Sequence, residues 1–129
     1  MKEQFVSAAI AQQLKEKGFN EPCMAYVYTG DTGNNIDRYC YGAITPEGNV
    51  EYKDWNSYDM CYSLPLWQQC IEWLREKHNI DISIEPGGKQ KMYAVFVSGN
   101  WIYENSKDRM LYSYNEARQA AIEHALTLI

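Results

Sequence analysis

Cysteine and histidine carry the most reactive side chains of this 129-residue chain. A thiol becomes a strong nucleophile when a neighbouring imidazole takes its proton. Cys70 and His78 are too far apart along one predicted helix to touch, and Cys61 precedes that helix without a recognisable partner. A thiol-dependent enzyme is therefore kept only as an alternative, and we predict no catalytic residues.

The same side chains are common zinc ligands, and one loop is rich in oxygen ligands. Structural zinc sites usually bring ligands in closely spaced pairs, whereas no two cysteines here have CxxC spacing. The segment DTGNNID at 31–37 alternates oxygen side chains as calcium loops do. However, its sixth position is Ile36 rather than glycine and its twelfth is Gly42 rather than glutamate. We therefore expect no metal, no cofactor and a plain hairpin loop at 31–37.

Acidic residues are concentrated in the middle of the chain. Between Phe19 and Glu72, eight acidic and two basic side chains give a charge of −6, against −5 for the whole chain. Binding to a phosphate backbone needs clustered Lys and Arg, and no GxGxxG or GxxxxGK motif is present to hold a phosphate. The acidic region could face a basic partner, but solubility is the simpler explanation.

Aromatic residues make up 14% of the chain, with 11 Tyr and 4 Trp. A domain of this size buries only part of them, and Tyr and Trp are favoured at interfaces. Ordinary half-buried strands are the alternative explanation. The candidate interaction surface comprises Tyr39, Tyr41, Asp54, Trp55, Tyr58, Asp59, Trp101 and Tyr103.

The segment SLPLWQQCIEWLREKHNIDISIEP, residues 63–86, gives the clearest structural prediction. Pro65 fits the first turn of a helix over 65–78, whose apolar side chains recur at helical spacing. Isoleucines then alternate with polar residues over 80–85, which is the period of a half-buried strand. We expect this helix to pack on the sheet, through Trp67, Ile71, Leu74, Ile80, Ile82, Val95 and Val97.

The remaining pattern predicts an α+β fold. A mainly antiparallel sheet is covered by three helices in a single domain over 1–129, and the second half has αβββα order. Ser113 and Glu116 form a capping box at the last helix. Residues 54–62 lack a clear period and are predicted as an ordered loop, while 104–112 are left unassigned. The helices are expected at 3–17, 65–78 and 113–129, and the strands at 23–29, 38–45, 50–53, 80–85, 91–98 and 101–103.

The αβββα order is also that of double-stranded RNA-binding domains, which the Ala-rich ending EARQAAIEHAL resembles. Those domains place a basic cluster at the start of the last helix. Here that position reads SYNEAR, with one arginine. A nucleic-acid-associated protein is therefore an alternative, and nucleic acid is a disfavoured partner.

Three segments together resemble a known group of proteins: KEQFV with LKEKGFNEPC, then LPLWQQCIEWLREKHNI, then YSYNEARQAAIEHALTLI. The chain is similar over nearly its whole length to small proteins of unknown function from phages, prophages and mobile elements of gut Bacteroidales. The resemblance implies an accessory protein of phage or mobile-element origin, and it transfers no site residues.

The N-terminus has no signal-peptide pattern and no apolar run is long enough to span a membrane, so we expect a cytoplasmic protein with free, mostly buried thiols. The leading interpretation is a non-enzymatic protein-interaction module that uses exposed aromatics and the acidic region 30–60. Its partner would be a host or phage protein, or a second copy of the chain in a homodimer.

Overall fold

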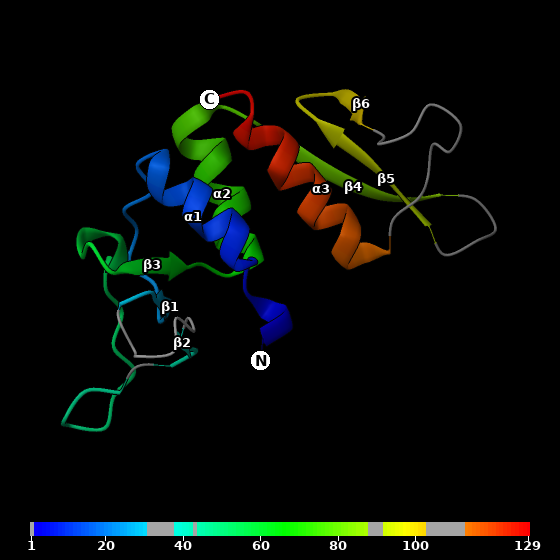
Figure 1. Ribbon diagram of the computed structural model, residues 1–129. Coiled ribbons are helices and arrows are strands. Elements are labelled where there is room, and N and C mark those ends of the chain that lie inside the picture. The colour runs from blue at the N-terminus through cyan, green and yellow to red at the C-terminus, as the bar shows by residue number, and fades with distance from the viewer. Residues whose placement is uncertain (1, 31–37, 43, 88–91, 103–112) are drawn as a thin grey trace. The chain divides into compact units, whose positions relative to one another are not determined.

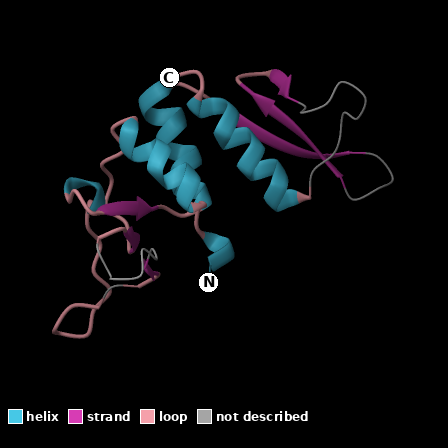
Figure 2. Ribbon diagram, in the orientation of Figure 1, coloured by secondary structure: helices cyan, strands magenta, loops and turns pink. Residues whose placement is uncertain are grey.

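The computed structural model in Figure 1 describes residues 2–30, 38–42, 44–87, 92–102 and 113–129. Within these ranges the fold is α+β, as predicted, with three α-helices and two three-stranded antiparallel sheets (Figure 2). The elements are α1 (Ala8–Glu16), β1 (Ala25–Tyr28), β2 (Arg38–Cys40), β3 (Cys61–Leu64), α2 (Trp67–His78), β4 (Ile82–Gly87), β5 (Met92–Val97), β6 (Asn100–Ile102), α3 (Tyr114–Leu126) and short 3₁₀ helices at Lys2–Gln4 and Trp55–Ser57.

The described strands form two sheets where one was predicted, because each set of three strands pairs only within itself. The sheet orders are β2-β1-β3 and β4-β5-β6, and α2 separates the two sets in the sequence. The chain accordingly groups into two compact units, residues 1–67 and 68–129. A single cooperative domain stays a prediction.

In the first unit, α1 begins later than predicted and ends where predicted. Ser7 caps the helix by accepting a hydrogen bond from the Ile10 N–H at 3.3 Å, so the preceding residues lie outside it. Gly18 has φ +86°, and the N–H of Phe19 donates to the carbonyl of Leu14 at 2.9 Å. This left-handed ending is one that glycine adopts without strain.

The β2-β1-β3 sheet has β1 at its centre. Ala25 and Val27 of β1 are buried, while Tyr26 and Tyr28 alternate with them on the opposite face. The helix α1 packs beside β3 (Figure 1). The hairpin of β1 with β2 is confirmed.

Two predictions for the first unit are wrong in detail. Residues 54–62, predicted as a loop, contain a 3₁₀ helix and the first part of β3. The β3 sequence CYSL shows no alternation of apolar and polar residues, and the strand is defined by its pairing with β1. The strand predicted at 38–45 is shorter, because β2 ends at Cys40. The strand predicted at 50–53 is replaced by two isolated bridges, one between Ile44 and Val50 and one between Cys23 and Lys53.

The second unit confirms the αβββα order, with α2, the β4-β5-β6 sheet and α3 in sequence. Ile82 pairs with Val97 and Ile84 with Val95, so these four side chains share one face. Both valines are buried, and α3 packs against β4 and β5 (Figure 1). Ser113 caps α3 by accepting from the Glu116 N–H at 3.3 Å.

Candidate functional site

The predicted interaction residues do not form one surface. Tyr39 lies opposite Val27, on the face of the β2-β1-β3 sheet that carries Ala25 and Val27. There it stacks on Tyr41, which also contacts Phe5, with ring centroids 6.1 and 5.3 Å apart. The aromatics from the segment around residue 55 gather instead on the opposite face.

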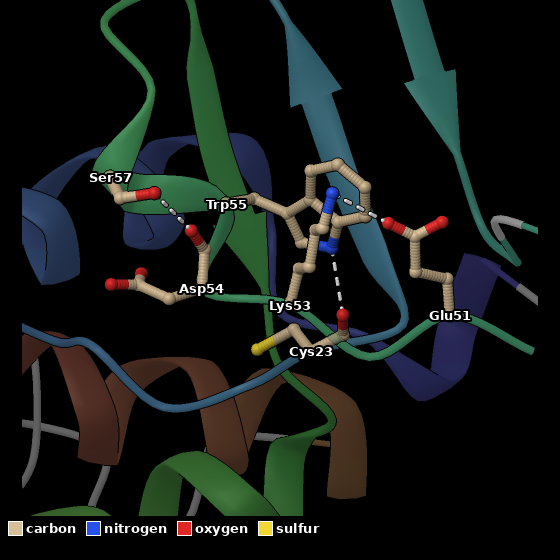
Figure 3. Close-up of polar contacts among 6 residues, drawn as sticks. All are labelled: Cys23, Glu51, Lys53, Asp54, Trp55 and Ser57. Atoms are coloured by element: carbon tan, nitrogen blue, oxygen red, sulfur yellow. Dashed lines mark hydrogen bonds and ion pairs between the residues drawn. The ribbon is translucent and has the colours of Figure 1, made fainter.

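Trp55 is the centre of that second cluster and is buried, which contradicts its predicted exposure. Its ring stacks on Tyr26 with the centroids 4.2 Å apart, and the residue is only 9% exposed. The indole Nε1–H donates to the carbonyl of Cys23 at 2.7 Å (Figure 3). Trp55 is buried because a neighbouring ring covers it and a backbone carbonyl satisfies its N–H.

Lys53 places an ammonium beside this cluster. Its Nζ lies 2.8 Å from a Glu51 carboxylate oxygen and 5.7 Å from the ring centroid of Trp55 (Figure 3). The ring centroid of Tyr58 is 5.8 Å from the same Nζ. The Glu51 carboxylate raises the pKa of Lys53 most, and the Tyr58 side chain raises it further. We call Glu51, Trp55 and Tyr58 the cation site.

The two predicted acidic residues have different roles. Asp54 precedes the 3₁₀ helix and accepts a hydrogen bond from the N–H of Asn56 at 3.1 Å, while its carbonyl accepts from the Ser57 hydroxyl at 2.8 Å. In Figure 3 the Asp54 carboxylate points away from Lys53. Asp59 is exposed. Asp54 is therefore a capping residue, and Glu51 is the carboxylate of the cation site.

The last two predicted residues lie in the second unit. Trp101 is in β6, where it pairs with Phe96. Tyr103 lies outside the described residues, as do the loop at 31–37 and the segment at 104–112.

Two side chains that the sequence did not single out hold the cluster in place. The Asn56 Nδ2 donates to the Phe19 carbonyl at 2.9 Å, and its Oδ1 accepts from the Ser63 N–H at 2.9 Å. Lys15 donates from Nζ to the carbonyls of Tyr58 and Cys61 at 2.7 and 2.8 Å. Most of these bonds join residues distant in sequence, so local patterns carry no signal for them.

The four cysteines are free, and three of them are buried, as predicted. Burial raises the pKa of Cys61, and the nearby Lys15 ammonium only partly opposes that effect. A raised pKa leaves less thiolate at neutral pH. This works against Cys61, the best placed cysteine in the thiol-enzyme alternative.

Large exposed apolar or tyrosine side chains are concentrated in one part of the described chain. Of nine such side chains, seven lie between residues 28 and 60, while Tyr114 and Leu128 lie elsewhere. The seven are Tyr28, Tyr39, Ile44, Val50, Tyr52, Tyr58 and Met60.

The start of α3 does not have the composition of a phosphate-binding helix. Its arginine, Arg118, lies over the Tyr114 ring, 4.9 Å from the centroid, and bonds to Asn115. The terminal histidine of α2, His78, contacts Trp73 edge-on with the rings 4.7 Å apart. Both side chains have partners within their own helix.

The described residues hold no cluster of metal ligands and no helix that could cross a membrane. Within the described ranges, no three His, Cys, Asp or Glu side chains gather as metal ligands. The helices that the structure describes are all too short or too polar to cross a membrane. Comparison of the chain with protein-family models, with curated proteins and with solved structures finds no match.

Proposed function

We propose that this protein is a non-enzymatic interaction module that binds a partner protein through residues 28–60. The observation that carries the proposal is that, among the side chains that the structure describes, seven of the nine large exposed tyrosine and apolar side chains lie in that segment. Tyrosine and methionine are enriched at protein interfaces. Tyr52 and Met60 are 60% and 53% exposed, which makes them the most direct contacts to test.

The charge of the first unit favours a basic partner. Residues 1–67 contain nine acidic and five basic side chains, a net charge of −4, whereas residues 68–129 have eight and seven, a net charge of −1. Complementary charge raises the rate of encounter and disfavours acidic competitors. The same charge disfavours nucleic acid as the partner.

The resemblance to small Bacteroidales phage and mobile-element proteins supports a role as an accessory protein in the bacterial cytoplasm. The partner is then a host or phage protein. A second copy of the chain is the alternative partner, and a homodimer would show as a doubled mass in light scattering of the purified protein.

The test is capture of partners from a Bacteroidales lysate by the tagged protein, with nuclease treatment. The variant carries Tyr52→Ser and Met60→Ser, and its control carries Tyr114→Ser and Leu128→Ser, which remove one exposed tyrosine and one exposed aliphatic side chain from the second unit. We expect one stoichiometric protein to survive nuclease, to bind the control and to be lost with the variant. Capture that is equal for both variants, or that nuclease abolishes, would contradict the proposal.

A further inference from the structure

We propose that the cation site binds an arginine or lysine side chain of the partner, and that Lys53 occupies this site in the unbound protein. This inference deepens the proposed function and rests on it. It names a position at which the basic partner would be recognised.

The composition of the site is that of a receptor for a positively charged N–H donor. Glu51 supplies a carboxylate, and the two rings of Trp55 and Tyr58 lie within 6 Å of the Lys53 ammonium, at 5.7 and 5.8 Å. Aromatic faces attract cations at such distances. The Glu51 carboxylate lies 2.8 Å from the ammonium, which favours an occupant that retains N–H donors.

The Trp55 side of the site is held independently of the Lys53 side chain. The carbonyl of Cys23 accepts both the Trp55 indole N–H at 2.7 Å and the Lys53 backbone N–H at 3.0 Å. The Cys23 N–H in turn donates to the Lys53 carbonyl at 2.8 Å. Tyr26 stacks on Trp55. Truncating Lys53 therefore leaves its backbone and the neighbouring indole in place.

The occupant, by contrast, is held only by its exposed end. The Lys53 side chain is 48% exposed, and its partner Glu51 is 26% exposed. An exposed ion pair of this kind contributes little stability, and a lysine stem is flexible. An incoming arginine can replace it, pairing with the carboxylate through two N–H groups and stacking its plane on the indole.

The test uses the full chain and two probe peptides, acetyl-Gly-Arg-Gly-amide and its lysine counterpart, with acetyl-Gly-Gln-Gly-amide as the neutral control. Binding is followed by NMR through the indole N–H resonance of Trp55. We expect Lys53→Ala to bind the arginine peptide roughly threefold to fivefold more tightly than the unsubstituted protein, because the competing ammonium is gone. Lys77→Ala removes an exposed lysine of the second unit and should leave the affinity unchanged.

Adding Glu51→Gln to Lys53→Ala should abolish the gain. Equal binding of the glutamine peptide, an equal gain with Lys77→Ala, or no gain with Lys53→Ala would overturn the inference. An unfolded Lys53→Ala variant would be recognised by loss of the dispersed Trp55 resonance, and Lys53→Gln then replaces it with the same expected gain. Failure here, with capture still dependent on Tyr52 and Met60, would leave the proposed function standing.

Discussion

At the scale of single residues, Cys23 contributes to the site through its backbone carbonyl. Its carbonyl accepts from both the Trp55 indole and the Lys53 backbone N–H, so both acceptor positions are used. The sulfur is buried, whereas the carbonyl orients the cation site.

Trp55→Phe tests the indole hydrogen bond. Phenylalanine keeps a ring that can stack on Tyr26, but it cannot donate to the Cys23 carbonyl. Removing a buried hydrogen bond typically lowers the free energy of unfolding by about 1–2 kcal/mol. Urea unfolding measures the loss, and Tyr114→Phe at an exposed tyrosine should change stability by less than about 0.5 kcal/mol. A Trp55→Phe variant as stable as the original would mean that the indole bond contributes nothing.

At the scale of elements, the sequence predicts the helices and strands whose apolar period or cap lies within their own residues. Helix α2 and the β4 and β5 strands carry regular apolar periods, and α3 carries a cap at Ser113. Strand β3 and the burial of Trp55 depend instead on pairing with β1 and on a bond to Cys23. Such long-range contacts leave no period in the sequence, which is why the candidate surface was predicted as one patch and divides between two faces.

Asn56 joins three elements, and its two amide ends can be tested separately. The Nδ2 donates to Phe19 after α1, and the Oδ1 accepts from Ser63 in β3. In Asn56→Asp the acceptor remains, but a carboxylate oxygen then faces the Phe19 carbonyl. We expect both Asn56→Asp and Asn56→Ala to lower the free energy of unfolding by about 1–3 kcal/mol. Thermal melts measure this, and near-complete rescue by aspartate would show that only the bond to Ser63 matters.

In the β5–β6 turn, by contrast with Asn56, we expect a substitution that increases stability. Ser98 and Gly99 both have positive φ, 51° and 81°, between the paired residues Val97 and Asn100. Two-residue hairpin turns of this geometry favour Asn-Gly. Ser98→Asn should therefore raise the free energy of unfolding by about 0.5 kcal/mol. Ser98→Val, which is β-branched at a positive φ, is the control and should lower it.

At the scale of the whole molecule, alkaline pH should destabilise the fold. Burial raises the pKa of Tyr26, Tyr41 and Cys61, and the bond to Glu51 raises that of Lys53. The folded state therefore holds these protons more tightly than the unfolded chain does. Their contribution is fully present below the ordinary thiol pKa of 9.0, and it is lost as pH rises through the folded values.

Urea unfolding at about pH 8 and about pH 10.5 measures that dependence. We expect the free energy of unfolding to fall between the two, and to fall less in Cys61→Ala, which has no thiol to titrate. A stability that stays constant, or that rises, over this range would contradict the assigned directions of the pKa shifts.

The sizes of the two compact units predict whether they unfold together or separately. They span 67 and 62 residues, and chains of about 60 residues bury only about 60% of their unfolded surface, which makes them marginally stable alone. We therefore expect residues 1–129 to unfold as one domain. Fluorine-labelled tryptophan provides a probe in each unit, Trp55 in the first and Trp73 in the second.

In urea, the two resonances should lose their folded signals at the same midpoint and with the same slope, since a two-state transition gives coincident curves for every probe. Ser98→Asn in the second unit should then raise the midpoint of both probes, and Asn56→Ala in the first should lower both. Two separate midpoints, each shifted only by the substitution in its own unit, would mean that residues 1–67 fold independently. In that case the exposed side chains and the cation site belong to a self-sufficient binding domain, and residues 68–129 need a function of their own.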